Sequence, residues 1–327
     1  MDWSKRRLAS RNPQHGNERG HEADRPSKIP KPGWWSILRR VYTSLSSKNL
    51  SILAGGVAFY AMLALFPALA ALVAVYGLWT DPATVQRQVS QMHGAIPGEA
   101  QNLIVTYLKT LVSAGSAKLG INLIVSVLVA LWSARAGMVS LIQALNIAYE
   151  EPEKRGLIRR EAVALGITVS AILFVIVVLV LIAAIPAALH LVPLGEKLRI
   201  LGYIIPWPVL IILMSTALAA TYRYGPSRRE PKWRWVSWGG LVATLLWVVA
   251  SALFSVYVAK FGNYDKTFSS LGAVVLLLMW LYISAYVVLL GACLDAEMER
   301  QTARDTIEGA EKPMGTRGAK MADTVAE

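Results

Sequence analysis

The most regular feature of the chain is a set of six long apolar stretches with almost no charged side chains. A helix crosses a bilayer core of about 30 Å with about 20 mostly apolar residues, and each stretch is longer than this. The stretches are runs of Leu, Val, Ile and Ala and lack the alternation of a membrane β-barrel strand. The pattern predicts an all-α, polytopic membrane protein with six transmembrane helices. These helices are expected at about residues 50–79, 119–149, 162–190, 201–222, 236–259 and 271–294.

Composition and charge agree with a membrane protein and predict its orientation. Of the 327 residues, 55% are hydrophobic and 17% are charged, which is unfavourable for a water-soluble domain of this size. The net charge is +12, and 25 of the 33 Lys and Arg residues fall in the two terminal segments and in the second and fourth connections. Because cytoplasmic segments are enriched in Lys and Arg, both termini are predicted to be cytoplasmic. The basic segments are expected to contact anionic membrane lipids, and no nucleic acid partner is expected.

The two ends of the chain differ from the apolar region in composition. Residues 1–33 and 301–327 are polar and contain too few apolar side chains to offset the entropy of ordering, so both are predicted to be disordered cytoplasmic tails. The six-helix domain is predicted to span residues 34–300. Its first segment, from Trp34 to Tyr42, mixes aromatic with basic residues and predicts a short helix at the membrane interface.

The first external loop, between residues 81 and 118, is expected to contain two amphipathic helices. Asp81 and Pro82 resemble a helix start, with an N-cap followed by proline at the first helical position. Apolar residues recur at helical spacing on both sides of Ile96-Pro97-Gly98. Three roles fit these helices, namely contact with the lipid surface, a cap on the bundle or a lid, and a simple cap is favoured.

Arg135 is the most informative single residue, because it lies inside the second predicted helix. An arginine at the centre of a membrane helix costs about 2.5–3.5 kcal/mol on insertion scales, so it should not face lipid. At 100° per residue, Asn146 lies about 20° and Gln143 about 80° from Arg135, which predicts a shared polar face towards the bundle. Two roles stay open: binding an anionic group or lipid headgroup, and structural contact with backbone carbonyls and helix ends.

Further candidate residues lie in other helices and turns. Small residues in the first helix permit close helix packing, and Pro67 is expected to kink it. The turn between the fifth and sixth helices is either a simple tight turn or a contact for a polar ligand. The acidic end of the sixth helix is most simply a solvated face, with pairing to nearby arginines as the alternative. The candidates are Tyr60 and Pro67 for a lipid path, Asn263, Tyr264, Asp265 and Lys266 for the turn, and Asp295, Glu297 and Glu299 for the acidic end.

The sequence offers little support for catalysis. None of the four histidines has metal-ligand spacing to Cys or carboxylates, and no phosphate-binding loop, nucleophile elbow or His-Glu-x-x-His helix is present. Cys293 is the single cysteine and is predicted to be a buried apolar thiol. The chain is therefore not expected to be an enzyme, and no catalytic site, metal site or cofactor is predicted.

Three motifs in order resemble the YihY/virulence factor BrkB family of bacterial membrane proteins. They are Ala58-Phe59-Tyr60-Ala61 with Leu65-Phe66-Pro67, the segment Leu141 to Tyr149, and the segment Phe261 to Val274. The resemblance covers about residues 34–300 and implies a six-helix inner-membrane protein. It implies no settled activity, since members have carried a ribonuclease label, been called virulence factors and been linked to envelope lipid traffic. Where the family usually has glutamate, this chain has Cys293, with Asp295 half a turn later.

These observations favour a non-ATP-driven transporter or flippase-like protein for a lipid or amphipathic anion in the cell envelope. The alternative is a structural or regulatory envelope protein that binds lipids or partners without transport. A ribonuclease is disfavoured, because the cytoplasmic segments hold no acid/base or metal cluster. Membrane lipids are the expected partners, and the small-residue face of the first helix fits packing within one chain or between protomers of a homo-oligomer.

Overall fold

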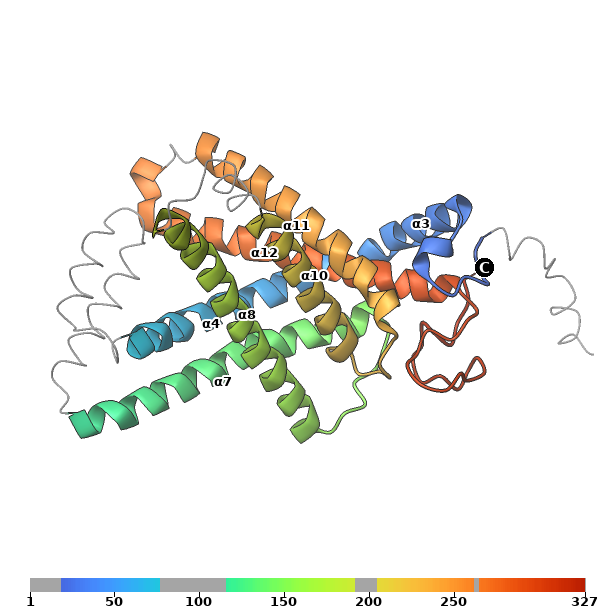
Figure 1. Ribbon diagram of the computed structural model, residues 1–327, viewed down its shortest axis with the longest axis horizontal. Coiled ribbons are helices and arrows are strands. Elements are labelled where there is room, and N and C mark those ends of the chain that lie inside the picture. The colour runs from blue at the N-terminus through green and yellow to red at the C-terminus, as the bar shows by residue number, and fades with distance from the viewer. Residues whose placement is uncertain (1–18, 77–115, 192–204, 262–264, 327) are drawn as a thin grey trace, which may run out of the picture.

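In the computed structural model, the described part of the chain comprises residues 19–76, 116–191, 205–261 and 265–326. It is all-helical, with seven α-helices and one short 3-10 helix, as predicted for the fold class (Figure 1). Six of the α-helices overlap the six predicted ones, and α3 precedes them. The bounds are η1 Pro26–Lys28, α3 Lys31–Ser47, α4 Leu50–Tyr76, α7 Ser116–Ala148, α8 Leu157–Leu191, α10 Pro206–Tyr224, α11 Trp233–Phe261 and α12 Asp265–Gln301.

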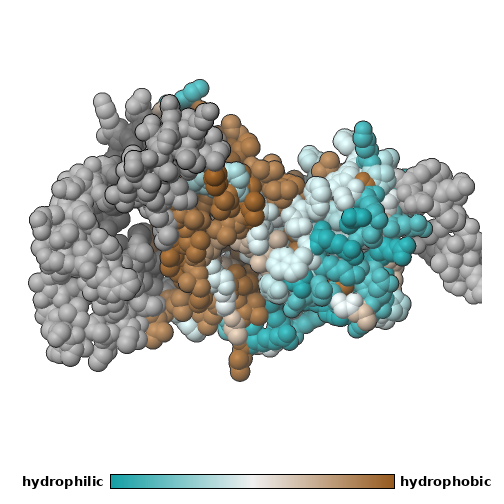
Figure 2. Space-filling model, in the orientation of Figure 1, coloured by the Kyte–Doolittle hydropathy of each residue, from teal (hydrophilic) through white to brown (hydrophobic). Residues whose placement is uncertain are grey.

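Several helices are long and apolar enough to cross a membrane. Among the described residues, three pass this test alone, at Leu157–Val178, Trp233–Lys260 and Val274–Gln301. A fourth span results if α3 and the first part of α4, bent by 65°, count as one. Figure 2 shows a band of hydrophobic surface and, beside it, a hydrophilic end that contains α3 and the C-terminal segment. The helical membrane class is confirmed, whereas six spans and cytoplasmic termini stay predictions.

α3 is a separate helix that lies across the hydrophilic end. The bend before α4 is made at Asn49, whose φ of 50° lies in the left-handed region that Asn tolerates better than most residues. One face of α3 buries Ile37 and Val41, and α3 packs against α12. The predicted helix at residues 34–42 is therefore confirmed, although its place at the membrane interface stays a prediction. Its exposed face carries Trp35, Leu38 and Tyr42.

α12 is the central helix, and α8 is the most peripheral. α12 contacts α3, α4, α7 and α11. The largest cluster of buried apolar residues draws on α4, α7, α10, α11 and α12, and includes Cys293, which is buried as predicted. None of the α8 side chains that the structure describes belongs to this cluster, and the main contacts of α8 are with α7 and α10. α8 therefore rests on the side of the bundle.

Two adjacent glycines allow α11 to approach helices on both sides. The amide of Gly239 donates a hydrogen bond to Asp295 Oδ1 of α12 at 2.8 Å, and an added Cβ there would overlap the Asp295 carboxylate. An added Cβ at Gly240 would lie 2.6 Å from the carbonyl oxygen of Ser215 on α10. A side chain at either position would force these helices apart.

The structure differs from the expectation of disordered tails at residues 19–33 and 302–326. The Arg317 guanidinium donates to four backbone carbonyls at 2.6–3.2 Å, and the Asp323 carboxylate accepts three backbone N–H groups at 2.7–3.1 Å. Thr302 Oγ1 donates at 2.6 Å to a carbonyl of the N-terminal segment. Low apolar content limits hydrophobic burial only, whereas charged side chains order this backbone through hydrogen bonds. The remainder of both predicted tails lies outside the described residues.

The acidic end of α12 is not a solvated face, so that interpretation was wrong. Glu297 and Glu299 have side-chain exposures of 1% and 0%. Glu297 accepts a hydrogen bond from Arg40 at 2.7 Å, and Glu299 from Arg228 at 2.8 Å. The alternative of pairing with nearby arginines is correct for both, because a buried carboxylate requires a cationic or hydrogen-bonding partner.

We predict that Gly239→Ala destabilises the protein by about 1–3 kcal/mol, because the new methyl group would overpack the contact between α11 and α12. Gly55→Ala on α4 is the matched control, since no atom lies within 4 Å of its added Cβ. Thermal unfolding in detergent would measure both variants. Equal unfolding midpoints for the two would contradict the close approach.

Candidate functional site

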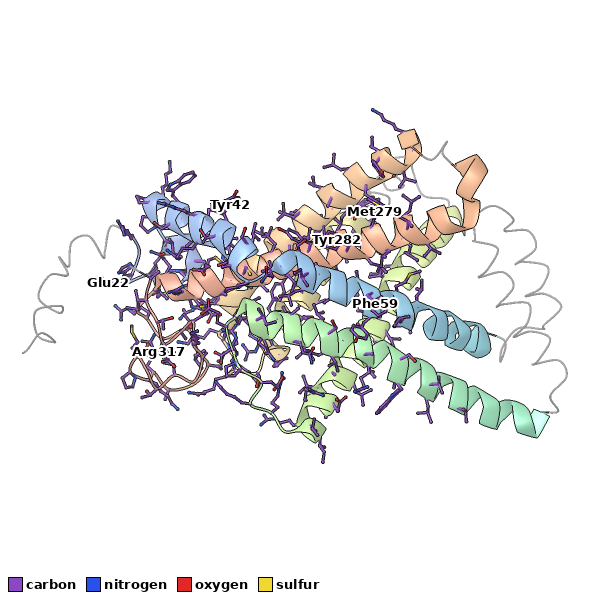
Figure 3. All side chains as sticks on the ribbon, turned by 180° about the vertical axis from the view of Figure 1, so that it is seen from behind. Glu22, Tyr42, Phe59, Met279, Tyr282 and Arg317 are labelled. Carbon is purple, nitrogen blue, oxygen red and sulfur yellow. The ribbon has the colours of Figure 1, made fainter. Side chains whose placement is uncertain are left out.

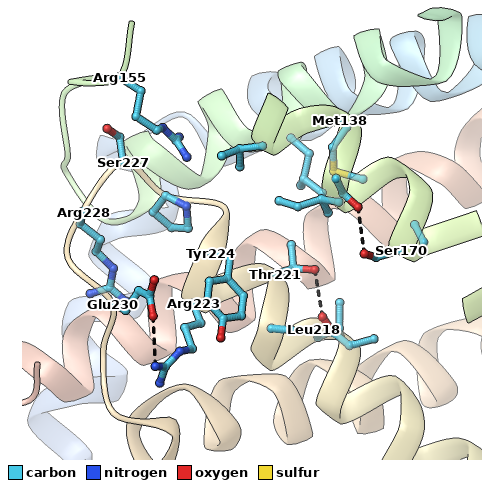
Figure 4. A pocket seen from close by; sticks show the side chains of 18 of the residues that line it. Met138, Arg155, Ser170, Leu218, Thr221, Arg223, Tyr224, Ser227, Arg228 and Glu230 are labelled. Carbon is cyan, nitrogen blue, oxygen red and sulfur yellow. Dashed lines mark hydrogen bonds and ion pairs between the residues drawn. The ribbon is translucent and has the colours of Figure 1, made fainter. Parts of the chain in front are cut away.

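A cavity of about 1100 Å³ lies where α8 separates from the rest of the bundle (Figure 4). α7, α8 and α10 form most of its walls, and Val288 of α12 contributes to them. The connections at residues 149–156 and 225–232, together with part of the C-terminal segment, form its polar end. Its location follows from the packing, because α8 contacts α7 and α10 without entering the core.

The walls of the cavity are apolar over most of their length. On α8, Gly166 has no atom within 4 Å of an added Cβ, so open space lies beside it. Apolar side chains from three helices line this region and suit hydrocarbon better than a polar solute. They include Met138 and Leu141 of α7, Val163, Ile167 and Phe174 of α8, and Met214 and Leu218 of α10.

The polar end of the cavity carries a basic rim of six Lys and Arg side chains, against two carboxylates from Glu230 and Glu308. This excess of positive charge beside low-dielectric walls favours an anionic group. The basic rim comprises Lys154, Arg155, Arg159, Arg223, Arg228 and Arg229.

The rim side chains differ in how fully they are paired. Arg155 donates to both carboxylate oxygens of Glu153 at 2.8 and 2.9 Å. Arg223 pairs with Glu230 at 3.2 Å (Figure 4) and with Glu308 at 3.4 Å. Arg229 donates from its guanidinium to two backbone carbonyls at 3.3 and 3.4 Å. Arg159 is exposed and makes no ion pair with any described residue. Arg159 and Arg229 are therefore the cations most available to a ligand.

Asn146, at the end of α7, fixes the two connections that carry the rim. Its Oδ1 accepts a hydrogen bond from the amide of Ser227 at 2.7 Å, and its Nδ2 donates to Glu153 at 3.0 Å. The pKa of Glu153 is lowered to about 2, chiefly by the hydrogen bond from Arg155 and against the opposing effect of partial burial. The carboxylate is thus ionised and holds the first connection beside the second.

Arg228 is the most deeply buried member of the basic rim, with a side-chain exposure of 1%. Its guanidinium lies 4.0 Å from the centre of the Tyr149 ring and donates to Glu299 on α12 at 2.8 Å. Burial opposes its charge, but the Glu299 carboxylate outweighs this effect, so the pKa of Arg228 lies above its ordinary value. Arg228 therefore connects the cavity to the acidic end of α12.

The polar face predicted around Arg135 is not assembled. Arg135 pairs with the carboxylate of Glu161 on α8, and its guanidinium lies 4.3 Å from the centre of the Trp132 ring. Gln143 is exposed, and Asn146 contacts the connections. Arg135 is not part of the cavity lining and joins α7 to α8.

The other predicted residues lie away from the cavity or outside the described residues. Tyr60 is exposed on α4, and Pro67 lies within α4, which continues to Tyr76. The predicted amphipathic helices fall within residues 77–115, which are not described. Of the external turn, Asn263 and Tyr264 are not described, and Asp265 and Lys266 are described only as the first residues of α12.

Sequence reasoning missed the residues that make the cavity polar. The Lys and Arg residues between α10 and α11 predicted only the orientation of the chain, although Arg228 and Arg229 are adjacent in this connection. The cavity itself has no sequence signal, because its walls come from three helices whose packing sets the gap. Within the described part of the chain, no three His, Cys, Asp or Glu side chains are grouped to hold a metal ion.

Comparison with known proteins identifies the family. The virulence factor BrkB family matches residues 41–315. The chain belongs to this family. The basic rim lies in the region that matches the BrkB family, as does the rest of the cavity lining except Gly318.

Relatives of the chain agree with a membrane protein. It is 26% identical over 273 residues to the ribonuclease-like protein YfkH of Bacillus subtilis, covering 81% of this chain and 96% of that protein. It is 24% identical over 270 residues to a UPF0761 membrane protein of Janthinobacterium sp., covering 81% of this chain but only 60% of that protein. A UPF0761 membrane protein of Azotobacter vinelandii is 40% identical over 85 residues, which is 26% of this chain and 21% of that protein. No solved structure matches the chain significantly.

We predict that Arg135 and Glu161 stabilise the contact between α7 and α8 as a pair. Arg135→Gln and Glu161→Gln should each lower the unfolding midpoint, because Glu161→Gln removes the carboxylate that pairs with Arg135 and Arg135→Gln leaves Glu161 with Arg160 alone. The double variant should recover part of the loss, with a coupling of about 0.5–3 kcal/mol. Additive losses in thermal unfolding would show that the pair is not coupled.

Acid should weaken the contact between the two connections. The lowered pKa of Glu153 contributes stability above its ordinary pKa, and this contribution is lost as the pH falls from about 4.5 towards 2. Thermal unfolding should show the wild type more stable than Glu153→Gln near neutral pH, with the difference shrinking at about pH 3. A constant difference across this range would contradict the ionised pairing.

Proposed function

We propose that this protein is a non-ATP-driven transporter or flippase-like protein of the bacterial inner membrane, which moves a lipid or amphipathic anion. The proposal is carried by one observation: the cavity joins apolar walls to a basic rim. A ligand that matches it has hydrocarbon at one end and a negative charge at the other. A membrane phospholipid with an anionic headgroup has both features.

The energetics favour such a ligand. Each buried methylene of an acyl chain contributes about 0.8 kcal/mol relative to water. The acyl chains of a membrane lipid already lie in hydrocarbon, so moving them to the apolar walls of the cavity changes their free energy little. The selectivity of binding therefore comes from the headgroup. The available guanidinium groups of Arg159 and Arg229 would bind a phosphate through charge-assisted hydrogen bonds.

The position of the basic rim supports a headgroup at membrane depth. The rim lies at the same hydrophilic end as α3 and the C-terminal segment (Figures 1 and 2). The distribution of Lys and Arg assigns this end to the cytoplasm. In this orientation the rim faces the headgroups of the inner leaflet, and the apolar walls extend into the bilayer core.

The peripheral packing of α8 supports a lateral entry for acyl chains. Its outward face is rich in exposed apolar side chains, among them Leu173 and Ile176. Since α8 is absent from the main core, a change in its position disrupts fewer buried contacts than a change in α12. The contact between Arg135 and Glu161 would hold α8 in the arrangement described here.

Filling the cavity should stop transport. We predict that Gly166→Phe, which places a ring in the open space beside α8, reduces the movement of fluorescent phosphatidylglycerol across proteoliposome membranes several-fold. Gly55→Phe also points into open space, but on α4 away from the cavity, and should retain the wild-type rate. Folded wild-type protein that moves no lipid above empty vesicles would instead favour a structural or regulatory role.

The basic rim should select for anionic headgroups. Arg159→Gln should slow phosphatidylglycerol movement more than phosphatidylcholine movement, because the guanidinium attracts the phosphodiester most when no choline offsets its charge. Arg39→Gln on α3 removes the same charge from an exposed site outside the cavity and is the control. An equal effect of Arg159→Gln on both lipids would exclude rim-based selection.

A further inference from the structure

Two carboxylates and one guanidinium form a buried cluster behind the cavity. Asp295 and Glu299 lie one turn apart on α12, and both are fully buried. Arg228, with 1% side-chain exposure, donates from Nη1 to Glu299 Oε2 at 2.8 Å. Asp295 accepts a hydrogen bond through Oδ1 from the amide of Gly239. Figure 3 shows the side chains of this crowded end of the molecule from behind.

The cluster has one more acidic group than it has cations. An uncompensated charge out of water is costly, so the favourable state holds one proton on the two carboxylates. Oδ2 of Asp295 and Oε1 of Glu299 have no hydrogen-bond partner among the described residues and are available to a proton. Among the described residues, Tyr149 after α7, Tyr222 on α10 and Thr306 of the C-terminal segment also interact with the acidic pair.

Neither neighbouring tyrosine adds a charge to the cluster. The pKa of Tyr149 lies well above its ordinary value, because burial and the nearby Asp295 carboxylate both oppose the phenolate. Tyr222 donates its hydroxyl hydrogen to the carbonyl of Val288 at 2.7 Å. The balance of charge in the cluster therefore rests on Asp295, Glu299 and Arg228.

Arg228 is also one of the residues that line the cavity (Figure 4), with its side chain only 1% exposed, which is a separate observation from the acidic pair. Its Nε and Nη2 are buried and have no hydrogen-bond partner in the described part of the chain. A buried guanidinium with unused donors is costly unless an acceptor arrives. An anionic oxygen in the cavity would be that acceptor.

We propose that Arg228 is shared between Glu299 and an anion in the cavity, so that binding of the anion is linked to uptake of a proton by Glu299. The inference rests on the proposed function, because it takes the ligand to be an anionic phosphodiester. In the free protein, Arg228 neutralises Glu299. When the phosphodiester engages the guanidinium, Glu299 loses its counter-charge, and a buried carboxylate without a cation is neutral.

The charges balance over this exchange. One negative charge enters with the phosphodiester, one proton enters from solution, and the net charge of the site is unchanged. If anion binding causes proton uptake, thermodynamic linkage requires that a lower pH also increases the affinity for the anion. The affinity rises by up to about tenfold per pH unit when one proton is taken up per anion. A transporter with this site would use a proton gradient to drive the anion.

The test measures protons and ligand together. Full-length protein in a non-ionic detergent is titrated with dihexanoyl phosphatidylglycerol by calorimetry, in buffers of different ionisation enthalpy. The phosphodiester carries no titratable proton near neutral pH, so any uptake belongs to the protein. We expect about one proton per ligand bound and affinity that rises between pH 8 and 6. A wild-type affinity independent of pH, with no uptake, overturns the inference.

Variants locate the proton. Glu299→Gln keeps the shape of the side chain and should bind the lipid with uptake near zero. Asp295→Asn imitates the protonated acid and should keep the uptake. Glu297→Gln is the matched control, because Glu297 is a buried carboxylate of the same helix that pairs with Arg40 outside the cavity lining. Undiminished uptake in Glu299→Gln overturns the assignment to Glu299.

The outcomes separate this inference from the proposed function. Lipid binding and vesicle transport without proton uptake overturn the inference and leave the transporter intact. Proton-linked binding without movement in vesicles supports the inference and overturns transport. No binding by folded protein overturns both.

Discussion

The buried ion pairs on the last two turns of α12 are the interactions on which the hydrophilic end depends. Glu297 and Glu299 are inaccessible to water, and their arginine partners come from α3 and from the connection between α10 and α11. Removing one partner of such a pair costs about 3–5 kcal/mol, because the other charge stays buried. These ion pairs hold α3 and the connection between α10 and α11 against the C-terminal end of α12.

The ordered C-terminal segment follows from the same arrangement. Thr306 contacts Glu299, and the amide of Lys232 donates to the carbonyl of Thr306 at 2.8 Å. Glu308 reaches Arg223 at the cavity mouth. Charged side chains and backbone groups of the hydrophilic end thus position the C-terminal segment. The segment in turn supplies part of the cavity lining. Most side chains of the basic rim are held in place by carboxylates or backbone carbonyls.

The cavity exists because one helix is packed differently from the rest. Small residues and glycines draw α10, α11 and α12 together, as at Gly239 and Gly240. α8 lacks such contacts with the core and is held at one end by Glu161 against Arg135. The result is an apolar space that is open beside α8 and closed by the connections.

The sequence by itself determined the helical membrane class and the extent of the long helices, because the length and hydropathy of a span are local properties that the bilayer thickness selects. It also identified Arg135 as needing a partner, and it related the motifs to the BrkB family. Only the tertiary structure decided that this partner is Glu161, that Asn146 fixes two connections, and that the acids of α12 are buried. Those outcomes depend on contacts between side chains from segments that are far apart in the chain. Hydropathy and helical periodicity are local properties and carry no information about such contacts.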